Sequence, residues 1–546
     1  MKIKLLTIIL SASVLTACGG EDNKSGTTAN SVPDKIISSV QPTPKTTHFP
    51  AKYNPAEVCN DLKHQWGPDL AEIANRVSCD YFPSQQSTSD TQQRQTPSQK
   101  KSFNIFYVHY KATAERRGTI FFNPGGPADA TPRMRNALLM LDIIDPDILK
   151  HYDVVTFDPR GTGYSALAHE LRTCLLTDKS TVKPAMKPAE VVALLDKEIA
   201  AMPDQPADNT ANSNEKAINN FISKQCGSIF QKYGSMFGAN TIVEDMDNLR
   251  QYLKLEKITP FMISYGTRVA ALYAYRHPEH VADIIIDSPV SPVTTDYVST
   301  LKMDGNNHRA IINWRFGHSA LQQSGVINNS IMDTGLYTDN AGNKIDKSTW
   351  NNIIADSVED PHPDQAIFWQ QDDATQLLAR LAHNADGGSS AAGLISRPLF
   401  MAITCADNSR PYSWQELDLA EPAWQGAGAA ARDNFNVCAD WPYPRSPIPS
   451  VQANEIKLAP DSVALILGGE FDSKTPFSGA EEMRNAFGAS ARLVKVEQTS
   501  QHGQIYYASC ADQSLKILLL GNKATLPGQQ HCPSKDDEDD EDDATQ

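Results

Sequence analysis

Residues 258–275 read Ile-Thr-Pro-Phe-Met-Ile-Ser-Tyr-Gly-Thr-Arg-Val-Ala-Ala-Leu-Tyr-Ala-Tyr. The run 258–263 is short and apolar, which predicts a buried strand, and 269–275 has the apolar spacing of a helix. Ser264 stands between the two, and Gly266 allows the helix to approach closely. A serine on such a turn is a candidate nucleophile, because its hydroxyl lies exposed at the end of a sheet. The alternative is a serine that merely begins a helix.

Further strands and helices alternate on both sides of this stretch. Apolar or alternating runs predict strands at residues 103–110, 118–122, 152–157, 284–286, 463–467 and 491–496, and helical spacing recurs at 240–255 and 480–487. A Ser/Gln/Thr-rich segment at 84–100 is predicted to be a loop. Strands separated by helices indicate an α/β fold, in which a mostly parallel sheet is flanked by helices.

A long central segment breaks the alternation. Residues 295–455 contain six of the seven tryptophans and show no regular succession of strands and helices. We interpret this segment as an inserted, largely helical cap. It would divide one sheet domain into a first part, 51–294, and a C-terminal part, 456–535.

Two further side chains follow late strands, where catalytic groups belong. A serine hydroxyl is a weak nucleophile that needs a base and a third group to orient that base. Asp472 follows the strand at 463–467, and His502 follows the strand at 491–496. Alone, His502 would be an ordinary loop residue. The order Ser264, Asp472, His502 is that of the α/β-hydrolase triad, so we predict these three as catalytic residues.

A glycine-rich turn after an early strand is the candidate oxyanion hole. The segment at 123–127 reads Asn-Pro-Gly-Gly-Pro and can point backbone N–H groups into the site. We predict that Gly126 and Tyr265 supply these N–H donors. An ordinary turn is the alternative. The Gly161-Thr162-Gly163 segment lacks the third glycine of a dinucleotide site, so no cofactor is predicted, and no metal site is predicted either.

The N-terminus resembles a bacterial lipoprotein signal. Lys2 and Lys4 precede a short apolar run at 5–14, which ends in Leu-Thr-Ala-Cys at 15–18. We therefore predict a signal peptide at 1–17 and lipid on Cys18. The alternative is an ordinary secretory signal that happens to contain a cysteine. Gly19 after the cysteine resembles the pattern that sorts lipoproteins to the outer membrane, so an exported, lipid-anchored protein of a bacterial outer membrane is expected.

Both ends of the mature chain have the composition of unfolded segments. Residues 18–50 are polar and rich in Gly, Ser, Thr and Pro, which predicts a flexible tether. Residues 536–546 contain eight consecutive acids, which predicts a disordered acidic tail. The formal net charge is −16 and stays negative without the tail. No nucleic-acid partner is therefore expected.

The cysteine count suggests disulfides. Apart from Cys18, an even number remains, which in an exported chain implies a disulfide framework. Zinc is disfavoured because no two of these cysteines lie two to four residues apart. Eight cysteines allow 105 pairings, so the sequence alone does not choose among them. They are Cys59, Cys79, Cys174, Cys226, Cys405, Cys438, Cys510 and Cys532.

Taken together, these motifs resemble the tripeptidyl/prolyl aminopeptidase family of exported α/β-hydrolases over about residues 55–535. Besides the motifs around the candidate triad, the resemblance rests on Asp158-Pro159-Arg160-Gly161-Thr162-Gly163, Ile403-Thr404-Cys405-Ala406-Asp407, Cys438-Ala439-Asp440-Trp441-Pro442 and Leu526-Pro527-Gly528 between the last two cysteines. Two positions depart from the family pattern. Met262 stands where glycine is usual, and Ala128 stands where a further glycine is usual.

The resemblance implies a function and a disulfide pattern. It implies a serine peptidase that releases residues or short peptides from free N-termini through an acyl-enzyme on Ser264, with a cap over the site. Peptides would be the substrates, and Asp407 in the cap is our candidate for binding their ammonium group, with a solvated carboxylate as the alternative. It also supports pairing in sequence order, namely Cys59–Cys79, Cys174–Cys226, Cys405–Cys438 and Cys510–Cys532.

Two other functions stay open at this stage. A carboxylesterase would use the same triad with a different pocket, because nothing in the triad separates esters from amides. A non-catalytic, lipid-anchored binding protein would have kept the fold without the reaction. Met262 supports the latter, and the complete set of Ser264, Asp472 and His502 speaks against it.

Overall fold

The computed structural model describes residues 47–65, 75–87, 100–127, 144–200, 211–316, 336–338, 344–346, 391–420 and 435–533. The predicted signal peptide with Cys18, the predicted tether up to residue 46, the acidic tail and the middle of the predicted cap lie outside these residues. Within the described part of the chain, no helix combines the length and the apolar character needed to cross a membrane.

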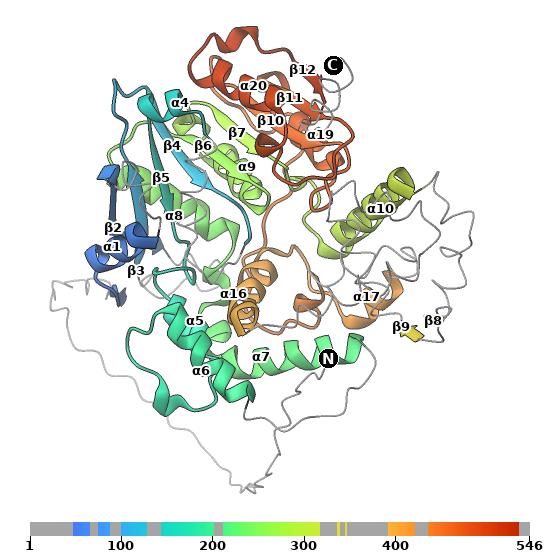
Figure 1. Cartoon of the computed structure of the whole chain (residues 1–546). Helices are drawn as coiled ribbons and strands as arrows, with labels where there is room; N and C mark the ends of the chain where they lie inside the picture. The colour runs from blue at the N-terminus through green and yellow to red at the C-terminus, as the bar shows by residue number, and fades with distance from the viewer. Residues whose placement is uncertain are drawn as a thin grey trace, which may run out of the picture.

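A ten-stranded sheet forms the centre of the fold (Figure 1). Its strands lie in the order β1-β3-β5-β4-β6-β7-β10-β11-β12, and β2 pairs with β3. The pairs β2–β3 and β3–β5 are antiparallel and the others are parallel, so the predicted mostly parallel sheet is confirmed. The strands are β1 (Thr47–Phe49), β2 (Val77–Ser87), β3 (Lys100–Tyr110), β4 (Gly118–Asn123), β5 (Tyr152–Phe157), β6 (Thr259–Ile263), β7 (Ile284–Asp287), β10 (Ala464–Gly469), β11 (Ala491–Val496) and β12 (Gln529–Cys532).

Both faces of the central strands are buried, which explains their continuous apolar runs. Along β7, Ile284 and Ile286 belong to one hydrophobic cluster and Ile285 belongs to the other, because successive side chains point to opposite faces. A strand buried on both faces reads as an uninterrupted apolar segment instead of an alternating one. That property made the central strands β4, β5, β6, β7 and β10 recognisable in the sequence.

Helices cover the two faces separately. One face packs against α1 (Pro55–Gln65), α4 (Pro146–His151) and α20 (Ser509–Leu519), whose apolar residues belong to the second cluster. The other face packs against α8 (Ala239–Tyr252), α9 (Tyr265–Arg276) and α19 (Phe477–Phe487), whose apolar residues belong to the first. The sheet and its two helical layers form an α/β domain.

The predicted cap contributes a separate group of helices. Its described parts contain α10 (Tyr297–Phe316), α16 (Ala391–Asp407) and α17 (Trp414–Ala420), together with the small hairpin of β8 (Leu336–Thr338) and β9 (Lys344–Asp346). Figure 1 shows α16 and α17 below the sheet and α10 beside them.

Three helices from the predicted first part of the core join this group. They are α5 (Ala168–Thr173), α6 (Pro188–Ala200) and α7 (Ala211–Tyr233), and all three contact α16 (Figure 1). Their buried faces, including Val191 and Phe230, pack with α16 residues such as Ile403 in one cluster. Within the range 51–294, this segment therefore lies with the cap, since its apolar faces are matched by α16.

Four disulfides brace the described chain, in the pairing that the resemblance implies. One of them joins α7 to Cys174, directly after α5 and within the cap layer, and another ties the end of α16 to residue 438. Closing loops of this length restricts the unfolded chain, which in the chain-entropy model contributes roughly 3–4 kcal/mol each. The pairs are Cys59–Cys79, Cys174–Cys226, Cys405–Cys438 and Cys510–Cys532.

Candidate active site

Ser264 occupies a strained turn between β6 and α9. Its φ is 56° and its ψ is −129°, a backbone conformation that side-chain-bearing residues rarely adopt and that costs about 1–3 kcal/mol. Although it stands at the N-cap of α9, its hydroxyl makes no capping hydrogen bond. Ser264 therefore does not serve as a side-chain cap of the helix. The turn has the geometry of a nucleophile elbow.

Two glycines make room for this turn. A Cβ on Gly125 would lie 2.7 Å from the Ser264 Cβ and 2.8 Å from the carbonyl oxygen before it, and its φ is +100°. A Cβ on Gly266 would lie 2.9 Å from the carbonyl oxygen of Asn123. Both positions hold glycine because the end of β4 and the start of α9 approach too closely for any side chain.

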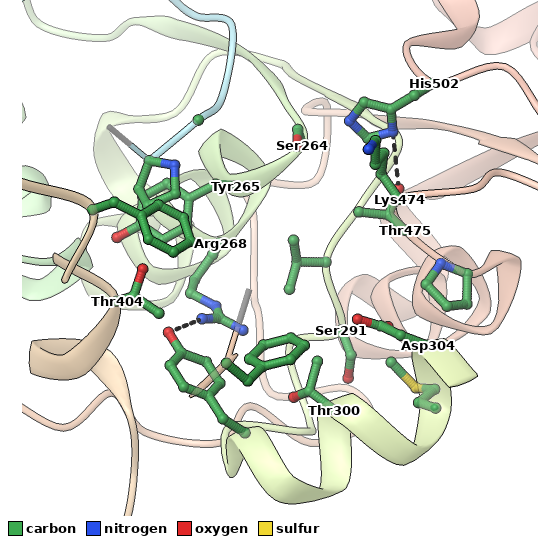
Figure 2. A pocket seen from close by; sticks show the side chains of 18 of the residues that line it. Ser264, Tyr265, Arg268, Ser291, Thr300, Asp304, Thr404, Lys474, Thr475 and His502 are labelled. Atoms are coloured by element: carbon green, nitrogen blue, oxygen red, sulfur yellow. Dashed lines mark hydrogen bonds between the residues drawn. The ribbon is translucent and has the colours of Figure 1, made fainter. Parts of the chain in front are cut away.

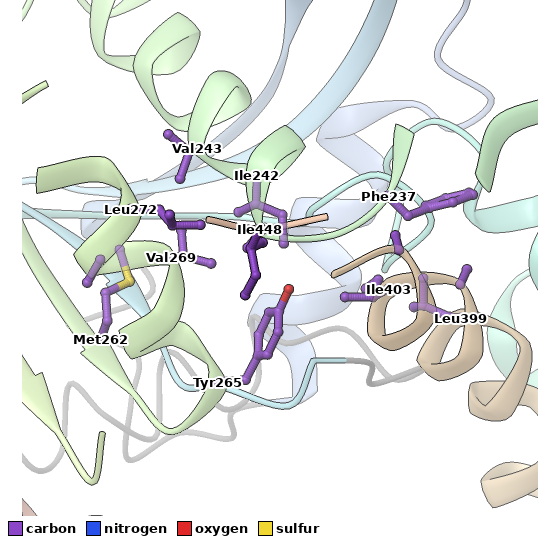
Figure 3. Packing of buried hydrophobic residues seen from close by; sticks show 14 of the residues in the cluster. Phe237, Ile242, Val243, Met262, Tyr265, Val269, Leu272, Leu399, Ile403 and Ile448 are labelled. Carbon is purple, nitrogen blue, oxygen red and sulfur yellow. The ribbon is translucent and has the colours of Figure 1, made fainter. Parts of the chain in front are cut away.

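Met262, the departure from the family pattern, is accommodated in the core. The residue is 2% exposed and belongs to the cluster between the sheet and α8 and α9. Figure 3 shows its side chain beside Val269 and Leu272 of α9. A flexible thioether fills an irregular gap there, so the side chain does not block the turn.

Asp472 and His502 meet at the carboxyl end of the sheet. Asp472 follows β10, and His502 lies in the loop after β11. The His502 Nδ1 lies 2.9 Å from Asp472 Oδ1 and 3.0 Å from Oδ2. The carboxylate is fully buried and also accepts hydrogen bonds from the backbone N–H groups of Lys474 and Thr475 and from the Thr475 hydroxyl. This contact directs Nδ1 to the acid and leaves Nε2 available to a substrate or a hydroxyl.

The environment of His502 favours its protonated form. Burial lowers its pKa, but the carboxylate of Asp472, through charge and hydrogen bonding, and the nearby Asp287 raise it, so the net pKa lies above 6.5. A base with a pKa in this range is suited to take and return a proton near neutral pH.

A second buried acid, Asp287, holds the loop that follows His502. Asp287, at the end of β7, accepts hydrogen bonds from the backbone N–H groups of Gln504 at 2.8 Å and Ile505 at 3.0 Å. The neighbouring Ser288 hydroxyl accepts from the Gly503 N–H at 2.8 Å. Burial raises the pKa of Asp287 to about 6, with the two N–H donors opposing this rise. Asp287 and Ser288 stand in no motif of the sequence, and together they fix the loop directly after the catalytic candidate His502.

The two predicted oxyanion donors lie beside Ser264. Gly126 and Tyr265 line the same cavity as the serine. The Gly125 N–H is engaged by the Asn123 side chain at 2.9 Å, whereas the N–H groups of Gly126 and Tyr265 donate to no acceptor within the described ranges. Two free N–H groups next to a serine hydroxyl are the arrangement that stabilises a tetrahedral oxyanion.

A cavity of about 410 Å³ connects these groups with the cap (Figure 2). This volume lies at the small end of the range of about 300–1,000 Å³ that is usual for small-molecule sites. Ser264 and His502 both line it from the sheet domain, and residues of α10 and α16 line it from the cap. The polar lining residues are Ser264, Tyr265, Arg268, Ser291, Tyr297, Thr300, Asp304, Thr404, Lys474, Thr475 and His502.

Comparison with known proteins agrees with this geometry. Residues 118–507 match the family model described as alpha/beta hydrolase fold, which is more than half of the chain. The chain belongs to the α/β-hydrolase fold family. The predicted fold class is thereby confirmed.

Three relatives are similar to this α/β-hydrolase over parts of its length. The tripeptidyl aminopeptidase of Streptomyces coelicolor is 25% identical over 422 residues, covering 71% of each chain. A protein named carboxylesterase B from Mycobacterium tuberculosis is 24% identical over 459 residues, covering 77% of this chain and 80% of its own. The serine protease Hip1 from the same organism is 24% identical over 185 residues, covering 34% of this chain and 32% of its own. The resemblance to tripeptidyl aminopeptidases is confirmed, and the chain is a serine hydrolase.

Asp407, the predicted ligand of a substrate ammonium, does not line the cavity of the hydrolase. It is fully buried at the end of α16, where its Oδ1 accepts from the Ala239 N–H at 2.7 Å and its Oδ2 accepts from the Tyr265 hydroxyl at 2.6 Å. Burial raises its pKa to about 6, and the Arg268 charge and these hydrogen bonds oppose the rise. The role suggested for Asp407 is corrected, because its Oδ2 joins the cap to Tyr265, the residue after Ser264, and its Oδ1 joins the cap to the start of α8.

Three charged residues that stand outside the predicted site do line the cavity, and one of them, Lys474, lies two residues after Asp472. Asp304 lies on α10 of the cap, and Arg268 lies on α9, four residues after Ser264 (Figure 2). Arg268 lies in the first turns of the helix that follows Ser264, and this closeness to the serine is a signal present in the sequence. Asp304 stands in no recognisable motif, so only the packing of α10 over the cavity reveals it.

Proposed function

We propose that this serine hydrolase is an aminopeptidase, which removes residues or short peptides from the free N-termini of peptide substrates. His502 takes the proton of the Ser264 hydroxyl, and Ser264 Oγ attacks the scissile carbonyl carbon. The N–H groups of Gly126 and Tyr265 stabilise the oxyanion, and Asp472 holds the imidazole in the required tautomer.

Proton return completes each half of the reaction. His502 gives its proton to the departing amine, which leaves an ester on Ser264. Water then loses a proton to His502 and attacks the ester, and the same residue returns the proton to Ser264 Oγ. Bonds and protons balance over the two steps, and no cofactor is needed.

The observation that carries the choice of an aminopeptidase is Asp304. Its carboxyl lines the cavity, and within the described ranges it makes no hydrogen bond and no ion pair. Burial raises its pKa well above 3.8, with Arg268 opposing and Asp472 adding to the rise. A carboxyl in this position lacks a counter-ion, and the ammonium group of a peptide N-terminus would supply one. The tripeptidyl aminopeptidases among the relatives support the same reading.

A matched set of amides tests this function. Aminoacyl and tripeptidyl p-nitroanilides should be hydrolysed at least about tenfold faster, in kcat/KM, than the same compounds acetylated at the N-terminus, since acetylation removes the charge that Asp304 binds. Equal rates for the free and acetylated amides would contradict the proposal.

A carboxylesterase is the second candidate. It is favoured by the relative named carboxylesterase B, which aligns over most of the chain, and the Ser264 chemistry serves esters equally well. Short-chain p-nitrophenyl esters in the same assay decide the point, because an esterase would cleave them and leave all amides intact. A fluorophosphonate that fails to label Ser264 would instead indicate a non-catalytic binding protein.

The location is also part of the proposal. We expect export, cleavage before Cys18 and lipid on its sulfur, which would place the enzyme on a bacterial outer membrane. Four disulfides suit an oxidising compartment outside the cytoplasm. Mass spectrometry of the mature N-terminus checks the lipid, and Cys18→Ser should move the protein to the soluble fraction.

A further inference from the structure

Arg268 points a charged group into the cavity close to the nucleophile. It lies on α9, four residues after Ser264 in the sequence, and both side chains line the same cavity. The side chain is buried, with 5% of the residue exposed, and it lines the cavity. Figure 2 shows Arg268 reaching in from α9, with Asp304 across from it on α10.

The hydrogen bonds of Arg268 leave most of its donors unused. Its Nη1 donates to the Tyr297 hydroxyl at 3.2 Å, and its Nε is buried without an acceptor. No carboxylate of the described residues lies within ion-pair distance of the guanidinium. Asp407 is near enough to act on it through charge, but both Asp407 oxygens are taken by other donors.

A buried guanidinium with unused N–H donors is stabilised when an anion binds to it. A guanidinium carries five N–H donors in a planar fork, and burying it without a paired acceptor is costly. The group that matches this fork best is a carboxylate, which binds it through two parallel hydrogen bonds. Tyr297 supplies one neutral acceptor and, with its ring centroid 5.7 Å from the guanidinium carbon, a cation–π contact, so the donors that remain in the fork form a binding position at the cavity.

We propose that Arg268 binds the side-chain carboxylate of the residue whose carbonyl Ser264 attacks, so that the preferred substrates carry Glu or Asp at that position. This inference rests on the proposed aminopeptidase function. Because Arg268 and Ser264 line the same cavity from neighbouring positions of the chain, we assign Arg268 to the residue next to the scissile bond. A glutamyl residue at a free N-terminus would then place its ammonium against Asp304 and its carboxylate against Arg268, which neutralises both groups at once.

The alternative ligand of Arg268 is a main-chain carbonyl oxygen of the substrate. A pair of isosteric substrates distinguishes a carboxylate ligand from a carbonyl ligand. The p-nitroanilides of Glu and Gln differ only in charge. The full-length enzyme should prefer Glu by about tenfold or more in kcat/KM, which is the usual worth of a hydrogen bond to a charged group. In Arg268→Gln this preference should fall to about one, while Arg268→Lys should keep part of it. Equal rates for Glu and Gln in the wild type would overturn the proposal.

Arg276→Gln is the matched control for these variants. It removes the same charge from the end of the same helix, where the side chain bonds to Asn240 and does not line the cavity. Its preference for Glu over Gln should equal that of the wild type. A loss of preference in Arg276→Gln as large as in Arg268→Gln would show a general charge effect and overturn the proposal.

A binding assay tests Arg268 independently of peptidase activity. Glutarate, which carries two carboxylates, should slow the labelling of Ser264 by a fluorophosphonate more strongly than glutaramide at the same concentration, and Arg268→Gln should remove the difference. If no amide is cleaved while glutarate protects Ser264, the proposed function fails and the carboxylate site stands. If glutarate and glutaramide protect equally in the wild type, the carboxylate site fails whatever the enzyme cleaves.

Discussion

The sheet domain and the cap each present an aspartate near the same cavity, and the two differ in their surroundings. Asp472 of the sheet domain accepts hydrogen bonds from two backbone N–H groups, a hydroxyl and an imidazole. Asp304 of the cap has no hydrogen-bond partner in the described part of the chain, and burial raises its pKa. The hydrogen bonds of the Asp472 carboxylate are satisfied without substrate, whereas those of Asp304 are not satisfied by the described residues. The sheet domain thus holds the reacting groups in position before substrate binds. The cap contributes a carboxyl group, unpaired among the described residues, that can select substrates by their charge.

The two regions are nevertheless tied together at the acid. On α10, the Asn307 amide donates to the Asp472 carbonyl at 2.6 Å, and His308 Nε2 lies 2.9 Å from the Ser473 carbonyl. On α16, Asp407 bonds to Tyr265 beside Ser264. The cap therefore contacts both ends of the triad, which fixes the distance between the selecting charge and the reacting atoms.

The largest expected effect lies in the sheet domain. Ser264→Ala and His502→Ala should each lower kcat by about 10⁴–10⁶-fold, and the double variant should be little worse, because the residues act as a unit. Steady-state kinetics on the best amide substrate measures both. His280→Ala, a change at a half-buried loop histidine outside the cavity, is the control. Retention of more than about a tenth of wild-type turnover by Ser264→Ala would exclude it as the nucleophile.

The next largest effect distinguishes the roles of Asp472 and Asp287, the two acids near His502. Asp472→Asn should reduce kcat by about 10⁴-fold, because an amide favours the wrong tautomer of His502. Should the loss stay below about tenfold, Asp287 would have to be the orienting acid instead. Stopped assays at several enzyme concentrations resolve rates over this range.

The cap acid should have a smaller and more selective effect. Asp304→Asn keeps the shape but removes the charge, so kcat/KM for amides with a free N-terminus should fall about 10–100-fold, mostly through KM. The acetylated amides should change far less, and Asp304→Glu should recover part of the loss. An equal loss on free and acetylated amides would show that Asp304 serves the fold and not the ammonium group.

The sequence predicted the sheet domain better than the cap, for physical reasons. Strands such as β6 and β7 are buried on both faces, so their apolar runs are visible without knowledge of the fold. The polar strands β2 and β12 were missed, since Val77–Ser87 contains a proline and Gln529–Cys532 lies at the sheet edge. The candidates Ser264, Asp472 and His502 could be chosen from the sequence because each lies in the turn or loop that follows a recognisable strand.

The binding residues depend on packing that no local pattern encodes. Asp407 was chosen as a conspicuous cap acid, but the close approach of Gly238 and the Ala239 N–H buries it. Arg268 could have been suspected because it follows Ser264 by only four residues. Asp304 and Asp287 acquire their roles only from the elements that fold against them.

The smallest predicted effect concerns pH. Because the pKa of His502 is raised above 6.5, the acid limb of kcat/KM should have its midpoint above pH 6.5, with activity lost as the imidazole gains a proton. The negative charge of Asp287 favours that proton. Asp287→Asn removes the charge, which lowers the pKa of His502 and should move the midpoint to lower pH.

A control on the same strand distinguishes charge from general damage. Asp283 precedes β7, pairs with Lys523 and accepts from the Val463 N–H, at the opposite end of the strand from His502. Asp283→Asn should lower stability without moving the acid limb, whereas Asp287→Asn should move it and also reduce kcat, since the amide can no longer accept from both Gln504 and Ile505. If the midpoint of Asp287→Asn stays at the wild-type pH while kcat falls, Asp287 acts on His502 only by holding its loop. A midpoint that moves in both variants would mean that the shift follows from loosening of β7 and not from the charge beside the histidine.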